Sequence, residues 1–186
     1  MRVLLLGNSF TYFHEMPQIL AGILNAEVVA HTRGGAYLAE QLDPETEMGA
    51  RTLAALRGER WDAVVLQEQS FGPVREKEGF LRSAAGLCGL AREAGATPVL
   101  YATWAYREGS EKLAGTGMSY GEMARALFES YHEAGRANAA PVADVGERFT
   151  ALRQILSLYE PDDYHPSEAG SALIAGVLAQ TLASLR

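Results

Sequence analysis

The sequence is short of several features that would each point to a definite class of protein. Its 186 residues contain one cysteine, Cys88, which excludes an internal disulfide and any metal site built from several cysteines. Lysine and arginine form no cluster, and the formal net charge of −7 argues against binding to nucleic acid or to an anionic membrane surface. No apolar run approaches the ~18 residues of a membrane span, and the run at the N-terminus is too short for a signal peptide. We therefore expect a cytoplasmic protein.

A glycine-rich phosphate loop is also missing. Neither G-x-G-x-x-G nor G-x-x-x-x-G-K follows the first predicted strand, which argues against nucleotide binding. Glu68, Asp162, Asp163 and His165 could gather around a hard cation, but nothing in their spacing requires one. The sequence therefore predicts neither a cofactor nor a metal.

What the sequence does contain is a regular alternation of short apolar runs and helical patterns. The predicted strands are residues 3–6, 27–31, 62–66, 97–103 and 141–145. The predicted helices are residues 16–25, 38–57 with a break near Pro44, 76–94, 119–138, 146–158 and 166–185. Residues 107–117 predict a long surface loop that could act as a lid. The alternation predicts one domain, residues 1–186, with a three-layer α/β/α architecture. Its sheet should be five-stranded, mostly parallel and doubly wound, in the flavodoxin-like order 2-1-3-4-5.

Residues suited to acyl transfer follow the first strand and precede the last helix. Ser9 comes two residues after Gly7, a glycine that allows a tight turn, so Ser9 is either a helix cap or a nucleophile. His165 is preceded by Asp162 at a three-residue spacing that lets the carboxylate face Nδ1, unless Asp162 or Asp163 only caps the last helix. Because parallel strands end at one edge of a sheet, these residues can share a site. They predict a nucleophile, a base and an orienting carboxylate.

The sequence resembles the SGNH hydrolases, also called GDSL-type esterases and lipases. The resemblance rests on Gly-x-Ser at residues 7–9, a glycine after the second strand, and Asp-x-x-His at residues 162–165. The segments GNSFT, LQEQS and DYHPSEAGS are similar to one little-characterised branch. The resemblance implies a serine esterase without a metal or cofactor, acting on a small-molecule ester. Ser9 would attack the carbonyl, His165 would take the proton and Asp162 would orient His165.

The resemblance also implies an oxyanion hole, and here one block departs from the family pattern. The backbone N–H groups of Ser9 and Gly35 are the implied donors, with Gly34 as the other candidate glycine. The usual Gly-x-Asn-Asp after the third strand is replaced by residues 67–70, Gln-Glu-Gln-Ser. Register places Gln69 where the asparagine would be, so its amide is the predicted third donor, and Gln67 is the alternative.

Several residues just past the strand ends are predicted to bind substrate: Asn8, Tyr37, Gln67, Trp104 and Tyr106. The three aromatic side chains fit the wall of a sugar or acyl site and fit the core equally well. Short acyl esters, with O-acetyl groups on carbohydrates first, are the expected substrates. The altered third block leaves a second class of function open, a non-catalytic domain that binds a carbohydrate or another metabolite. The oligomeric state is not predicted.

Overall fold

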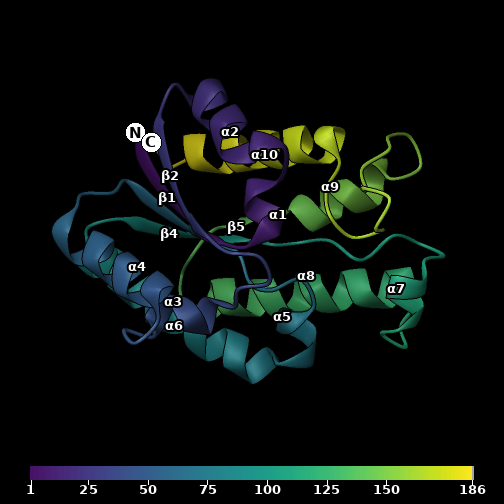
Figure 1. Cartoon of the computed structure of the whole chain (residues 1–186), viewed down its shortest axis with the longest axis horizontal. Coiled ribbons are helices and arrows are strands. Elements are labelled where there is room, and N and C mark those ends of the chain that lie inside the picture. Colours follow the sequence, from purple (N-terminus) through teal and green to yellow (C-terminus); the bar gives the residue numbers. More distant parts are fainter. Residues whose placement is uncertain (186) are drawn as a thin grey trace.

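A computed structural model describes residues 1–185, which form a parallel five-stranded sheet between two layers of helices (Figure 1). The strands are β1 (Arg2–Gly7), β2 (Glu27–Thr32), β3 (Ala63–Leu66), β4 (Thr97–Tyr101) and β5 (Val142–Ala143). They lie in the order β2-β1-β3-β4-β5, and each neighbouring pair is parallel. The predicted fold class and strand order are confirmed.

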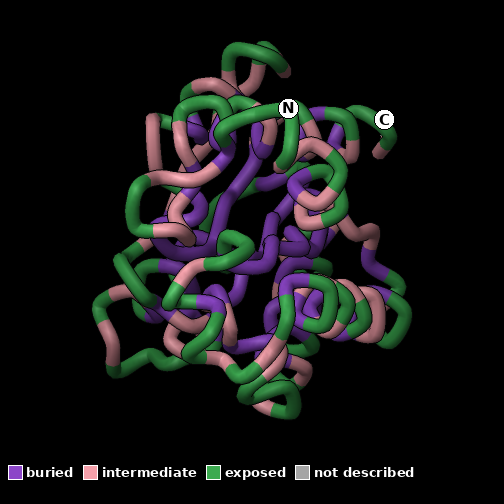
Figure 2. Tube along the Cα trace, turned by 90° about the vertical axis from the view of Figure 1, so that its right-hand side faces the viewer, coloured by how far each residue is buried: buried purple, intermediate pink, exposed green. Residues whose placement is uncertain are grey.

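The central strands are apolar on both faces because helices cover both faces. In β1, Val3 and Leu5 pack into one core, and Leu4 and Leu6 pack into the other. Successive side chains of a strand point to opposite faces, so a continuous apolar run supplies both cores at once. Figure 2 shows the resulting pattern, with buried chain inside a shell of exposed turns.

Ten α-helices and one 3₁₀ turn lie between or after the strands within residues 1–185. They are α1 (Ser9–Tyr12), η1 (Phe13–Glu15), α2 (Met16–Leu24), α3 (Leu38–Leu42), α4 (Glu47–Gly58), α5 (Gly72–Arg75), α6 (Lys77–Glu93), α7 (Glu111–Ala114), α8 (Tyr120–Ala137), α9 (Val145–Leu152) and α10 (Glu168–Ala183). Helices α2, α9 and α10 cover one face of the sheet, and α3, α4, α6 and α8 cover the other (Figure 1). None of these helices is long and apolar enough to cross a membrane.

The break predicted near Pro44 is confirmed, since residues 38–57 form two helices and Thr46 starts α4 by accepting a hydrogen bond from Gly49 N at 3.0 Å. The helices differ from the prediction where a short segment is involved. Helices α1, α5 and α7 each have four residues, which is too short to give a 3.6-residue period. The predicted loop 107–117 contains α7, and the predicted helix 146–158 ends at Leu152.

Gly7 ends β1 where two polar side chains approach its backbone. A Cβ atom at this position would lie 2.5 Å from Gln67 Oε1 and 2.5 Å from Thr11 Oγ1. Gln67 Oε1 is held there by hydrogen bonds from Asn8 N and from the Thr11 hydroxyl, both at 2.9 Å. Residue 7 must therefore be small because of this close approach. The tight-turn explanation was wrong, since Gly7 is not among the glycines with a positive φ.

Gly7→Ala should lower the free energy of unfolding by about 1–3 kcal/mol, because the added methyl group forces the Gln67 amide out of place. Denaturant unfolding followed by circular dichroism measures this loss. Gly22→Ala in α2 is the matched control, since a Cβ at residue 22 meets nothing within 4 Å. The control should be stabilised by about 0.4–1 kcal/mol. Equal effects of the two substitutions would contradict the packing argument.

Candidate active site

Three predicted side chains from the two ends of the chain meet at the edge of the sheet where the strands end. Ser9 Oγ lies 2.8 Å from His165 Nε2, and His165 Nδ1 lies 2.6 Å from Asp162 Oδ2. Ser9 is the first residue of α1, and His165 lies in the loop before α10. The geometry is that of a nucleophile within reach of a base that a third group orients.

Asn8 sets the position of Ser9. Its side-chain oxygen accepts a hydrogen bond from Phe10 N at 3.1 Å, so Asn8 is the cap of α1. The alternative in which Ser9 is the cap is wrong, and the Ser9 hydroxyl is free to face His165. Asn8 Nδ2 also donates to Ala36 O at 3.0 Å, which ties this turn to the loop that carries Gly35.

The loop that carries His165 is folded around Asp162. One carboxylate oxygen, Oδ1, accepts from the backbone N–H groups of Tyr164 and His165 at 3.2 and 3.0 Å, and the other faces the imidazole. Burial acts to raise the pKa of Asp162, but the hydrogen bonds from the His165 ring and from these two N–H groups together lower it. Asp162 is therefore kept ionised beside the ring. Asp163 turns away, with φ at 71°, and pairs with Arg107 at 3.3 Å.

Neither of these two aspartates caps the last helix. Ser167 does so, accepting from Gly170 N at 3.1 Å. The capping alternative for Asp162 and Asp163 is wrong, and Asp162 instead spends its hydrogen bonds on the loop and the ring of His165.

Three aromatic rings pack against the imidazole of His165. The Phe13 ring stacks on His165 with 4.2 Å between centroids and 2° between planes. The Tyr164 ring lies 4.1 Å away at a tilt, and Phe10 presents its edge at 5.7 Å. These contacts fix the ring plane, which hydrogen bonds alone would leave free to rock. Phe13 and Tyr164 are not among the predicted site residues, although each lies within four residues of one.

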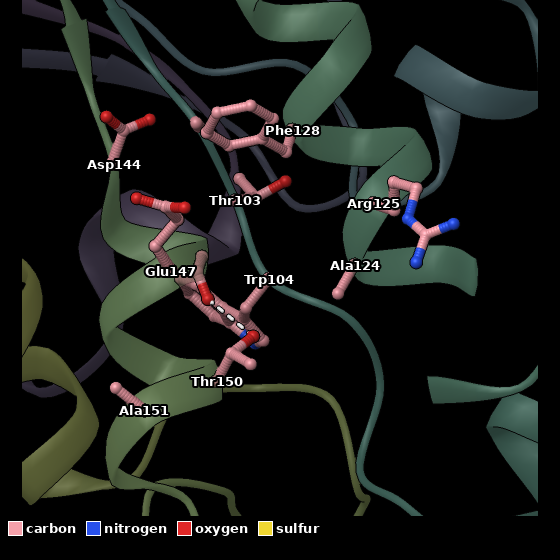
Figure 3. Close-up of a pocket in the computed structure, with 11 residues that line it drawn as sticks. Thr103, Trp104, Ala124, Arg125, Phe128, Asp144, Glu147, Thr150 and Ala151 are labelled. Atoms are coloured by element: carbon pink, nitrogen blue, oxygen red, sulfur yellow. Dashed lines mark hydrogen bonds between the residues drawn. The ribbon is translucent and has the colours of Figure 1, made fainter. Parts of the chain in front are cut away.

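The segment after β4 anchors the same loop. Trp104 Nε1 donates to Tyr164 O at 3.1 Å, and Arg107 N donates to Asp163 O at 2.8 Å. Trp104 has no exposed surface, and its ring stacks between Phe10 and Phe149 at 4.4 and 4.1 Å. Its predicted role as a substrate-binding wall is therefore wrong for this site. Trp104 instead borders a separate cavity of about 350 Å³ between α8 and α9 (Figure 3).

A pocket of about 450 Å³, here called the Ser9 pocket, opens over Ser9 and His165. Four more predicted residues line it: Asn8, Gly35, Gln69 and Tyr106. Gly34 lines it as well, so both glycines remain candidates for the oxyanion hole. Gly35 has a positive φ, at 70°, which a residue with a side chain would adopt at a cost. Further lining comes from Tyr12, Ser70 and Lys112, which the sequence analysis did not single out.

The two glutamines of the third block have different environments. Gln69 Oε1 accepts from Phe71 N and Gly72 N, both at 3.0 Å. Its Nε2 donates one hydrogen bond to Ser70 Oγ at 3.2 Å, and both residues line the Ser9 pocket. Gln67 is 1% exposed and does not line that pocket, so its predicted contact with substrate is wrong.

Tyr37 does not line the Ser9 pocket, so its predicted contact with substrate stays a prediction. Its hydroxyl accepts from Arg75 Nη2 at 2.6 Å, and Tyr37 is the N-terminal cap residue of α3.

Among residues 1–185, no three His, Cys, Asp or Glu side chains are grouped so as to hold a metal ion.

Glu68 is a buried carboxyl that joins two segments of the site. It is 2% exposed, and its Oε1 accepts from Leu38 N at 3.2 Å and from Gln69 N at 2.6 Å. Leu38 begins α3 directly beyond the loop of Gly35, so one carboxyl oxygen connects that loop to Gln69. Burial raises the pKa of Glu68 to about 7 against the opposing effect of these two hydrogen bonds. The sequence pattern indicates no role for Glu68 beyond that of a possible metal ligand.

The fold and the site together define a serine hydrolase of the three-layer α/β/α type. No family model matches the chain, and no curated protein matches it. A solved structure from Slackia heliotrinireducens, assigned to the SGNH hydrolases, is 48% identical with a TM-score of 0.93 over 98% of each chain. The chain belongs to the SGNH hydrolases, as the resemblance implied, and thus to a family of esterases and lipases.

More distant solved structures share the fold. TesA is 16% identical, with a TM-score of 0.75 and full coverage of both chains. Axe2, an acetylxylan esterase from Geobacillus stearothermophilus, is 15% identical, with a TM-score of 0.70 over 97% of this chain and 93% of its own.

Titration of Glu68 should make stability depend on pH in a defined direction. Its pKa is about 7 in the folded chain against an ordinary 4.5, so the unfolded chain loses this proton at lower pH. The contribution of Glu68 to the free energy of unfolding is complete below about pH 4.5 and falls by up to about 3 kcal/mol as the pH rises to about 7. Glu68→Gln keeps an acceptor oxygen and cannot titrate.

Urea unfolding of both proteins between pH 4.5 and pH 8 tests this expectation. The free energy of unfolding of Glu68→Gln minus that of wild type should increase as the pH rises to about 7 and stay constant above it. All other groups titrate alike in the two proteins and cancel in this difference. Parallel stability curves for the two proteins would contradict it.

Proposed function

We propose that this SGNH hydrolase is an esterase that removes short, acetyl-type acyl groups through a triad of Ser9, His165 and Asp162. The observation that carries the proposal is the unbroken series of hydrogen bonds, 2.8 Å from Ser9 to His165 and 2.6 Å from His165 to Asp162. Each residue is of the type, and in the order, that acyl transfer requires.

The reaction follows from these contacts. Ser9 Oγ attacks the ester carbonyl while His165 Nε2 takes its proton, and ionised Asp162 holds the tautomer and stabilises the imidazolium. Collapse of the tetrahedral intermediate breaks the bond to the alcohol, whose oxygen receives the proton from His165. Water then attacks the acyl-enzyme with His165 again as the base, which releases the acid and restores Ser9.

Three donors would stabilise the oxyanion. The N–H of Ser9 is at the first position of α1, where no acceptor exists within the helix. The N–H of Gly35 and Nε2 of Gln69 are the other two, and both residues line the Ser9 pocket. Gln69 supplies the amide that asparagine supplies in the usual family pattern, and its orientation is held by the hydrogen bonds from Phe71 and Gly72.

O-acetylated carbohydrates are the substrates that the Ser9 pocket fits best. The pocket has aromatic walls from Tyr12, Tyr106 and Tyr164 and polar groups from Gln69 and Ser70, a combination suited to a sugar ring and its hydroxyl groups. Axe2, which shares the fold, acts on acetylated xylan by its name. A shared fold is a weak guide to substrate, so this assignment depends mainly on the residues that line the pocket.

Labelling with a fluorophosphonate probe tests the triad. The wild-type protein should be labelled and should hydrolyse 4-nitrophenyl acetate, and Ser9→Ala should lose both properties while keeping its circular dichroism spectrum. Asp162→Asn should reduce kcat by ~10⁴, because the required tautomer of His165 is lost. Asp163→Asn is the matched control and should cost far less, since Asp163 pairs with Arg107.

Absence of labelling at Ser9 in the folded wild-type protein would favour a non-catalytic domain that binds a carbohydrate or another metabolite. A greater loss with Asp163→Asn than with Asp162→Asn would show that the wrong aspartate has been assigned to His165.

Gln69→Ala tests the oxyanion hole. It should lower kcat by ~10²–10³ with little change in KM, because the hydrogen bond reaches full strength only when the carbonyl oxygen carries charge. Gln69→Glu isolates the donor, since a carboxylate can still accept from Phe71 N and Gly72 N but offers no N–H. The Glu variant should be at least as impaired as the Ala variant. A kcat near wild type in both would mean that the hole consists of backbone donors alone.

A further inference from the structure

Lys112 is the one lysine or arginine among the described residues that line the Ser9 pocket, and no aspartate or glutamate accompanies it in that lining. It lies on α7, in the segment 107–117 that the sequence predicted as a loop. Its Nζ is 3.9 Å from the centre of the Tyr164 ring and 5.7 Å from that of Tyr106. The negative faces of these two aromatic rings thus attract the ammonium group and hold it at the pocket.

Lys112 forms no ion pair within the part of the chain that the structure describes. Within residues 1–185, no carboxylate lies within 4.0 Å of its Nζ, whereas three arginines in adjoining segments each have one. Those pairs are Arg33 with Glu40, Arg75 with Glu76, and Arg107 with Asp163. In a chain of net charge −7, Lys112 therefore gives the lining of the Ser9 pocket a positive charge, while the ionised carboxylate of Asp162 lies behind His165 and outside that lining. Such a pocket favours an anionic ligand.

The chemistry of the proposed function indicates which part of the substrate meets this charge. His165 must deliver its proton to the leaving alcohol oxygen, so the alcohol lies on the side of His165. Tyr164 is on that side, with its ring 4.1 Å from the imidazole, and Lys112 lies over Tyr164. The ammonium group is therefore close to the alcohol portion of the ester rather than to the acyl portion.

We propose that Lys112 selects esters whose alcohol portion carries an anionic group, such as the carboxylate of an acidic sugar or of another hydroxy acid. The inference rests on the proposed function and narrows it to a substrate class. Lys112 acts in recognition only, since the bonds made and broken are those of the acyl transfer. A partly exposed charge pair of this kind should change the preference between matched anionic and neutral esters by about two- to fivefold.

Two acetyl esters that differ only in charge at the far end of the alcohol provide the test. The leaving group of 4-acetoxybenzoate carries a carboxylate, and that of 4-acetoxybenzamide carries a neutral amide of nearly the same shape. The ratio of kcat/KM for the two esters is measured in wild type and in Lys112→Met, which keeps the length of the side chain over Tyr164. The ratio should fall about two- to fivefold in the Met variant, and Lys112→Arg should retain it.

Ionic strength gives a second readout that a packing role would not change. Added 0.5 M NaCl, a concentration at which the screening length is roughly 4 Å, should lower the wild-type ratio and leave the Met variant's ratio unchanged. An equal ratio in wild type and Lys112→Met, with both esters hydrolysed, would overturn this inference and leave the esterase proposal intact. Hydrolysis of neither ester by wild type, or equal hydrolysis by Ser9→Ala, would overturn both.

Discussion

The hydrogen bond between Ser9 and His165 joins residues 156 positions apart, and the rest of the structure holds both residues in place for it. A bond of 2.8 Å tolerates little error at either end, so each partner needs its own support. Ser9 is fixed by the end of β1 and the Asn8 cap. His165 is fixed from the opposite direction, by the segment after β4, through Trp104 Nε1 and Arg107 N. Because β1 and β4 are both hydrogen-bonded to β3, the sheet fixes the segments that support Ser9 and His165 relative to each other.

Buried polar side chains at the ends of β1 and β3 are costly unless each finds partners, and here the partners are other parts of the site. Gln67 accepts from Asn8 N, Asn8 donates to Ala36 O, and Glu68 accepts from Leu38 N and Gln69 N. These hydrogen bonds connect the segment after β1, the loop of Gly35 and residues 67–70 to one another. An apolar core could fill the same volume but would not fix the direction of these backbone groups.

The sequence was sufficient to predict the fold and the proximity of Ser9, His165 and Asp162, because parallel strands end at one edge and the motifs follow strand ends. It was insufficient where tertiary packing decides. Gln67 and Gln69 are two residues apart and looked interchangeable, but β3 ends at Leu66, so the strand alternation that would have paired them no longer applies. Trp104 follows a strand end as a binding residue would, yet the ring is enclosed by Phe10 and Phe149. Lys112 gave no signal because α7 is a single turn.

The turn after α1 has a strained backbone conformation next to the site. His14 and Glu15 are consecutive residues with φ of 48° and 55°, a left-handed conformation that costs non-glycine residues roughly 1–3 kcal/mol each. The reversal they produce directly follows Phe13 and lets its ring lie flat on His165. His14 Nε2 also meets Glu160 Oε1 at 2.7 Å, which links the strained turn to the loop that carries the imidazole. The strained backbone, the stacking on His165 and the hydrogen bond from His14 to Glu160 thus act on the same two segments, which carry the nucleophile and the base.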